Sequence, residues 1–190
     1  MEDIEREAGL MARDGSEAPR VLELARRVLG GRDGVVAVPG RALPGDGALV
    51  RVRGRVQIYV KSGISTERVR WVVAHELGHL ALGLDSSSRA NEDACDAFAA
   101  ALLLPRQAFG AALAEVGPSY AKLARWFVTT ESCAALRLGE VTGVPLALIT
   151  PKRIRTRGAE FSWPADLSRR VPGLKRATLR DDRRRVALRA

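Results

Sequence analysis

The chain has 190 residues, 46% of them hydrophobic, and a formal net charge of +9 at pH 7. This length fits about one domain with an extension, and the apolar content excludes a wholly disordered or fibrous protein. The longest apolar run, Ala97–Leu104, is far shorter than the ~20 residues of a membrane-spanning helix. The N-terminus lacks the pattern of a signal peptide, and two cysteines are too few for a disulfide framework. We therefore expect a cytoplasmic protein.

The excess positive charge lies entirely at the C-terminal end. Residues 151–190 contain 13 Lys and Arg against 4 Asp and Glu, whereas residues 1–150 contain 18 of each. Such a basic segment is either a solvated tail or a contact for nucleic acid or an acidic partner, and charge alone carries little specificity. We expect at most a weak nucleic-acid contact through residues 151–190.

The first part of the chain predicts a helix followed by a small sheet. Apolar residues at helical spacing indicate a helix over Ala18–Leu29, and Val35–Val38 has the composition of a short strand. Apolar residues then alternate between Val50 and Val60. This alternation predicts a hairpin with the loop Arg53-Gly54-Arg55, in which Val52 pairs with Val56 and Val50 with Ile58, so that one face is apolar.

The rest of the chain is predicted to be mainly helical. One helix is expected from its N-cap Ser65 to Leu82, ended by Gly83, and a second from its N-cap Asn91 to Pro105. Two shorter helices are expected over 118–127 and 131–141, with strand-like segments at 146–149 and 153–157. The order of helix, small sheet and further helices indicates an α+β fold.

The two histidines of the chain stand in the string His75-Glu76-Leu77-Gly78-His79. Residues four apart on a helix differ by about 40° in direction, so both imidazoles project from one face and can bind one ion. Glu76 lies between them and can reach a water held by that ion. This H-E-x-x-H arrangement is typical of zinc hydrolases, and the alternative is a pair of ordinary histidines on a helix surface.

A catalytic zinc ion normally has three protein ligands and a position open to water, so the third ligand must be Asp, Glu or Cys. On the next helix Glu92 and Asp96 share a face. We assign Glu92 as the third ligand and Asp96 as the carboxylate that accepts the second ring N–H of a ligating histidine. Cys95 is an alternative but less usual ligand for a hydrolytic site, and both carboxylates could instead simply face solvent.

Two longer stretches resemble the ImmA/IrrE family of metallo-endopeptidases. The first runs from Arg68 to Leu80 (RVRWVVAHELGHL), and the second runs from Glu92 through Cys95 to Pro105 (CDAFAAALLLP). A looser resemblance continues through 123–129 and 134–138. The resemblance implies a zincin-like protease core with a small antiparallel or mixed sheet and one zinc ion per chain. It also implies that His75, His79 and Glu92 are the ligands and Glu76 the catalytic glutamate. Asp96 stands where the family more often has Asn.

By this resemblance the chain divides into three parts. A zinc peptidase core is expected at 16–117, a helix-turn-helix-like helical subdomain packed on it at 118–150, and a basic C-terminal segment at 151–190. The second helix of the pair offers only Arg137 against Glu131 and Glu140, which is a poor surface for DNA phosphates. We therefore interpret the pair as a structural element.

The function implied is a zinc-dependent intracellular endopeptidase that hydrolyses a peptide bond in a partner protein. The resemblance suggests that this partner is a helix-turn-helix transcriptional repressor. The alternative is a non-enzymatic regulator or toxin–antitoxin-type protein that retains the zinc fold and contacts protein or DNA through its basic C-terminus.

Amide hydrolysis also needs a donor for the oxyanion. The phenols of Tyr59 and Tyr120 and the guanidinium groups of Arg68 and Arg70 are candidates. Tyr59 lies on the strand before the H-E-x-x-H helix, where a peptide could add as an extra strand, although a packing role is the simpler interpretation.

Overall fold

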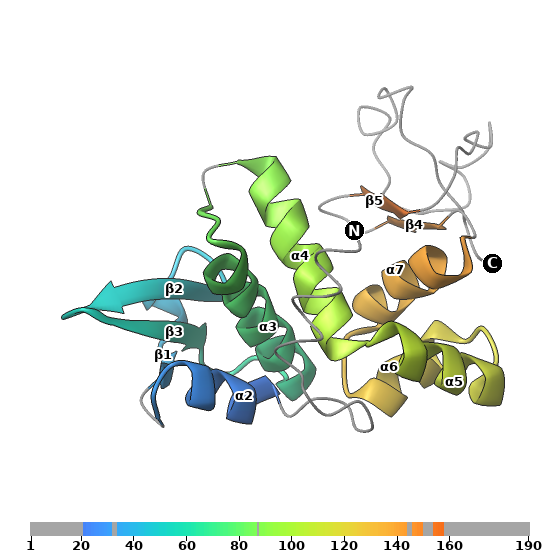
Figure 1. The fold of residues 1–190 in the computed structure, drawn as a ribbon, viewed down its shortest axis with the longest axis horizontal. Coiled ribbons are helices and arrows are strands. Elements are labelled where there is room, and N and C mark those ends of the chain that lie inside the picture. The colour runs from blue at the N-terminus through green and yellow to red at the C-terminus, as the bar shows by residue number, and fades with distance from the viewer. Residues whose placement is uncertain (1–20, 32–33, 87, 144–145, 150–153, 158–190) are drawn as a thin grey trace.

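The computed structural model describes residues 21–31, 34–86, 88–143, 146–149 and 154–157. In chain order the elements are α2 (Val21–Val28), β1 (Val35–Val38), the 3-10 turn η2 (Gly40–Ala42), β2 (Gly47–Val52), β3 (Arg55–Lys61), α3 (Thr66–Leu82), α4 (Arg89–Leu103), α5 (Arg106–Val116), α6 (Tyr120–Phe127), α7 (Glu131–Thr142), β4 (Leu146–Ile149) and β5 (Ile154–Arg157). Helices α3 and α4 form the middle of the molecule, with the three-stranded sheet on one side and α5, α6 and α7 on the other (Figure 1). This arrangement confirms the α+β class.

The sheet has the strand order β1-β3-β2, with β1 parallel and β2 antiparallel to the central strand β3. The predicted hairpin register is wrong by one residue. The turn has two residues, Arg53 and Gly54, with φ of 48° and 79°, and Val52 pairs with Arg55. Two-residue turns with positive φ at both positions match the twist of the flanking strands, which favours this closure.

The shifted register changes which residues of β2 face the core. Val50 pairs with Gln57 and is 36% exposed, whereas Leu49 pairs with Ile58, which is fully buried. Because side chains alternate along a strand, a slip of one position moves every apolar residue of β2 to the other face. The valines at 50 and 52 therefore do not share the apolar face that we expected.

The two central helices have well-defined ends. Ser65 caps α3 by accepting the Arg68 N–H, and Gly83 ends it, as predicted. For α4 the prediction of Asn91 as N-cap is wrong: the cap is Ser88, whose hydroxyl accepts the Asn91 N–H at 3.2 Å. Helix α5 was not predicted at all. The two shorter predicted helices are present as α6 and α7.

One hydrophobic cluster runs from α2 to α7, so it includes residues from both the predicted core and the predicted helical subdomain. On α7 the stretch Cys133–Gly139 is buried. Arg137 lies within it and donates from Nε to the carbonyl oxygen of Leu104, at the end of α4, at 2.9 Å. The middle of α7 therefore faces protein and is not available to enter a DNA groove.

Among the described residues no single helix is long and apolar enough to cross a bilayer. Helices α4 and α5 reach that length and apolar content only when they are taken together, and they are bent by 62° relative to one another. Most of the basic segment at 151–190, and the first residues of the helix predicted from Ala18, lie outside the described residues.

Candidate metal centre

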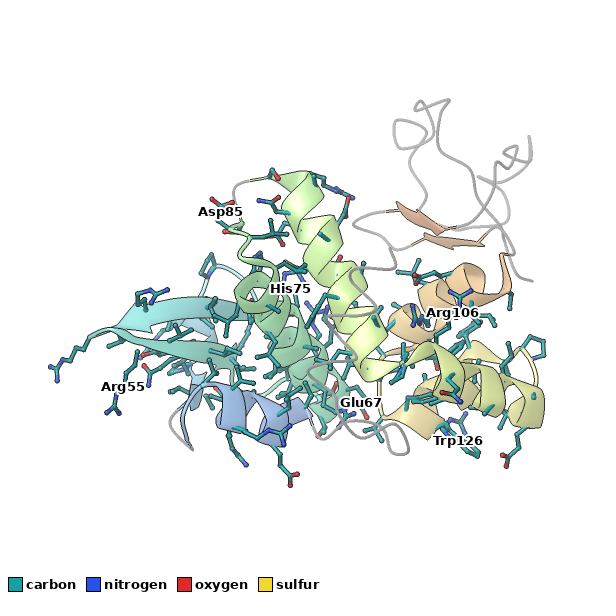
Figure 2. The ribbon with its side chains drawn as sticks, viewed as in Figure 1. Arg55, Glu67, His75, Asp85, Arg106 and Trp126 are labelled. Carbon is teal, nitrogen blue, oxygen red and sulfur yellow. The ribbon has the colours of Figure 1, made fainter. Side chains whose placement is uncertain are left out.

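Three donor groups converge between α3 and α4. His75 and His79 project from α3, and Glu92 from the first turn of α4; Figure 2 shows His75 between the two helices. The two Nε2 atoms are 3.2 Å apart, and the Glu92 carboxylate oxygens lie 3.3 Å from His75 Nε2 and 3.5 Å from His79 Nε2. Ligands bound at 2.0–2.1 Å around a tetrahedral zinc ion are about 3.3 Å from one another. The spacing of these donor atoms therefore fits a zinc ion.

The close approach of α3 and α4 depends on Gly78. A Cβ at this position would lie 3.2 Å from Cα of Cys95 and 3.2 Å from Cδ1 of Phe98, closer than ordinary van der Waals contact, so a side chain would fit only if these atoms moved by a few tenths of an ångström. Cys95 is about one helical turn after Glu92 on α4. The contact at Gly78 thus brings Glu92 within reach of the two histidines.

Each histidine has a partner for its other ring nitrogen. Nδ1 of His75 is 3.0 Å from Oδ1 of Asp96, and Nδ1 of His79 is 3.0 Å from the carbonyl oxygen of Leu84. Such partners fix the tautomer and the ring orientation of a ligating imidazole. The contact with Asp96 has the geometry that we expected for that residue; the contact with Leu84 is made by a backbone atom that no residue pattern indicates.

Burial and neighbouring charge set the proton affinities of the site. Burial alone would lower the pKa of His75, but the hydrogen bond and charge of Asp96, with the charges of Glu76 and Glu92, outweigh it and raise that pKa. The pKa of Glu76 is also raised, chiefly by burial, although the two histidines and a hydrogen bond from the Leu49 N–H oppose the shift. Both groups therefore hold a proton more readily than they would in water.

Cys95, the alternative third ligand, is fully buried. Burial raises the pKa of its thiol to about 12, so the neutral thiol persists at physiological pH. Its sulfur does not belong to the His75, His79 and Glu92 group of donors. The geometry therefore favours Glu92 over Cys95.

A cavity of about 360 Å³ opens beside these donors. Its walls include Glu76, the indole of Trp71 and the backbone of Gly47 at the start of β2. Two ion pairs lie at the wall: Arg68 Nε is 2.8 Å from Asp46 Oδ2, and Arg89 Nε is 3.4 Å from Asp93 Oδ2. The site is thus a polar, largely acidic pocket that contains the Glu76 carboxylate and two guanidinium groups beside the potential metal ligands.

Of the residues considered as oxyanion donors, Arg68 lies in this cavity and three others do not. The Tyr59 hydroxyl donates to Gln57 Oε1 at 3.2 Å, and its strand β3 is the central one, so a peptide cannot add beside it. Arg70 Nη2 donates to the carbonyl oxygen of Phe127 at 3.5 Å. Tyr120 begins α6 and packs against the core. Tyr59, Arg70 and Tyr120 are therefore not among the residues that line the cavity, whereas Arg68 is.

Comparison with known proteins identifies the family to which this chain belongs. A solved structure of a Mycobacterium tuberculosis transcriptional regulator has a similar fold, with a TM-score of 0.59 and 18% sequence identity. That match covers 77% of this chain and 51% of the other, so this chain spans about half the length of that protein. No match was found among curated proteins. The family model of the IrrE N-terminal-like domain, Peptidase M78, matches residues 33–139, and this chain therefore belongs to that family.

Proposed function

We propose that this protein is a zinc-dependent endopeptidase, with one zinc ion per chain, that hydrolyses a peptide bond in a partner protein. The observation that carries the proposal is the tetrahedral spacing of the His75, His79 and Glu92 donor atoms beside the carboxylate of Glu76. Structural zinc sites usually have four protein ligands, whereas catalytic sites have three and a water. Membership of the Peptidase M78 family supports the same activity.

In the proposed reaction Glu76 takes a proton from the attacking water and delivers it to the leaving amine. Burial raises the pKa of this carboxylate, which makes it a stronger base, and the Leu49 N–H holds it in place. Asp96 and the Leu84 carbonyl keep the two Nε2 lone pairs directed at the ion. When bound, zinc supplies an acidified water and polarises the scissile carbonyl. Arg68, held by Asp46 in the same cavity, is the remaining candidate for a donor to the oxyanion.

We propose that an extended peptide binds along β2 rather than beside β3. The Asp46 carbonyl accepts the Lys61 N–H at 2.9 Å. In an antiparallel ladder hydrogen-bonded and non-hydrogen-bonded pairs alternate, so the backbone groups of Gly47 point away from β3. Gly47 lines the cavity, and β2 is an edge of the three-stranded sheet. A peptide strand added at this edge would pass the proposed zinc ion.

From the family resemblance we propose that the substrate is a cytoplasmic helix-turn-helix repressor. Co-expression of this protein with candidate repressors, followed by mass spectrometry of the fragments, tests the proposal. The wild-type protein should cut one of them, and Glu76→Gln should bind zinc without cutting it.

The metal site itself is tested by the zinc content of protein purified without a chelator or a histidine tag. Wild-type protein should contain about one zinc ion per chain, as the three-ligand site requires. Glu92→Ala should lose most of it, whereas Asp93→Ala is the matched control. Asp93 is on the same turn of α4 and lines the same cavity but is not one of the three donors. A folded wild-type protein that takes up no zinc would refute the proposed activity.

A further inference from the structure

The last turn of α3 and the residues after it form a closed ring with His79. The Leu84 N–H donates to the His79 carbonyl oxygen at 3.1 Å, and His79 Nδ1 lies 3.0 Å from the Leu84 carbonyl oxygen. A carbonyl oxygen only accepts hydrogen bonds, so Nδ1 must carry the hydrogen. The lone pair of His79 is then on Nε2, the atom that faces His75 and Glu92.

Gly83 directs the Leu84 carbonyl towards the ring. It has φ 62° and ψ 28°, the left-handed conformation, and its own N–H also donates to the His79 carbonyl oxygen. Residues with a Cβ adopt this conformation at a cost, which is greatest for β-branched ones. No atom lies within 4 Å of the position that a Cβ would occupy at Gly83. A substitution there acts through backbone conformation and not through a clash.

We propose that Gly83 is a positioning residue for the metal site: its left-handed conformation selects the Nδ1–H tautomer of His79 and aims Nε2 at the ion. The two proposed histidine ligands are thus oriented by different means. His75 is held by the carboxylate of Asp96, and His79 by a backbone carbonyl presented by a helix cap. The part of this proposal that concerns zinc affinity rests on the proposed function, whereas the part that concerns the tautomer does not.

The test compares Gly83→Val with Gly143→Val. Gly143 ends α7 with φ 69°, also has no atom within 4 Å of its Cβ position, and is not among the residues of the site. The two substitutions therefore impose similar backbone strain on two helix caps, since both glycines are left-handed. Gly83→Asn is the conservative variant, because Asn adopts the left-handed conformation far more readily than Val. Gly83→Ala provides a milder change if the valine variant does not fold.

Zinc affinity is the first measurement, made by competition with a chromophoric chelator. Loss of a partner of a ligating histidine typically weakens metal binding 10–100-fold. We expect Gly83→Val to bind zinc at least about tenfold more weakly than the wild-type protein. Gly143→Val and Gly83→Asn should stay close to the wild-type affinity. An equal loss in both valine variants would overturn the proposal, since it would reflect general destabilisation.

The tautomer of His79 is the second measurement, made on metal-free protein by long-range ¹H–¹⁵N NMR at alkaline pH. The chain has only two histidines, so the spectrum holds two imidazoles. Wild-type protein, Gly143→Val and Gly83→Asn should show His79 as the Nδ1–H form, and Gly83→Val a mixture. An unchanged tautomer in Gly83→Val refutes the positioning role even if that variant binds zinc more weakly. A changed tautomer in a protein that binds no zinc supports the positioning role and refutes the proposed function.

Discussion

Replacing Gly78 by alanine should destabilise the protein, although alanine is the better helix former. In a helix interior the change from Gly to Ala contributes about 1 kcal/mol in favour of folding. At Gly78 the new methyl group would lie 3.2 Å from Cα of Cys95, 3.3 Å from its Cβ and 3.2 Å from Cδ1 of Phe98. The nearest of these atoms are backbone and a fully buried ring, so α4 has to shift by a few tenths of an ångström at this point. Overpacking of this kind costs about 1–3 kcal/mol, which leaves a net loss of about 1 kcal/mol.

The matched control is Gly110→Ala in the middle of α5. No atom lies within 4 Å of the Cβ position at Gly110, so only the gain in helix propensity applies there. Urea denaturation of the metal-free proteins should show that Gly110→Ala is more stable than wild type by up to about 1 kcal/mol and that Gly78→Ala is less stable. Zinc affinity should fall in Gly78→Ala only, because α4 carries Glu92. If Gly78→Ala is stabilised as much as Gly110→Ala, the helices do not approach one another closely at this point.

Three further predictions concern protons, a buried cation and a thiol. In metal-free protein the raised pKa of His75 contributes stability that is fully present below its ordinary value of 6.5 and is lost as pH rises through the folded value. Urea denaturation in chelator should therefore give lower stability at pH 8 than at pH 6, and saturating zinc should reverse the trend, because zinc binds neutral imidazole. Arg137→Met removes the donor to the Leu104 carbonyl and a contact of 3.2 Å with Glu140, and should lower the unfolding free energy by about 1–3 kcal/mol without changing zinc affinity. A variant as stable as wild type would show that the buried guanidinium is not needed. Because burial raises the pKa of Cys95 to about 12, iodoacetamide should label it only after unfolding, as mass spectrometry of the peptides would show; rapid labelling of folded protein would contradict this.

Local rules of helix geometry were enough to predict part of the site. The i, i+4 spacing of His75 and His79 puts both rings on one face of any helix, and Ser65 and Gly83 are typical helix ends. The approach of Glu92 to the two histidines depends instead on how closely α3 and α4 pack. A glycine within a helix does not indicate, from sequence alone, which residue packs against it. The partners of His79 and Glu76 are the backbone atoms of Leu84 and Leu49, and every residue has such atoms. Their positions come from tertiary structure.

The errors in the sheet and in the candidate donors have related causes. The β-hairpin closes with Arg53 at φ of 48°. Arginine is not a residue type that favours the left-handed conformation, so the sequence does not predict a two-residue turn at this position. Periodicity alone therefore allowed the three-residue loop that we predicted. Tyr59 is a candidate from the sequence because β3 directly precedes α3 in the chain, but β3 is the middle strand of the sheet. Arg70 is two residues after Arg68 on α3, so the two side chains point about 160° apart, and only Arg68 lines the cavity.

The three proposed ligands come from one pair of consecutive helices, α3 and α4. Asp85 in the short connection between them accepts a hydrogen bond from Asn91 Nδ2 on α4 at 3.0 Å. An ion at this position would act as a clip across that connection. Cross-linking a loop of roughly 15 residues lowers the conformational entropy of the unfolded chain, which stabilises the folded state by about 3 kcal/mol. This stabilisation falls on the pair of helices α3 and α4 rather than on the sheet or on α6 and α7. Removal of the ion should therefore first accelerate amide hydrogen exchange in α3, α4 and the connection between them. Scarcity of the metal would then switch off the proposed peptidase activity through a local opening, and an otherwise folded chain would recover as soon as the ion returns.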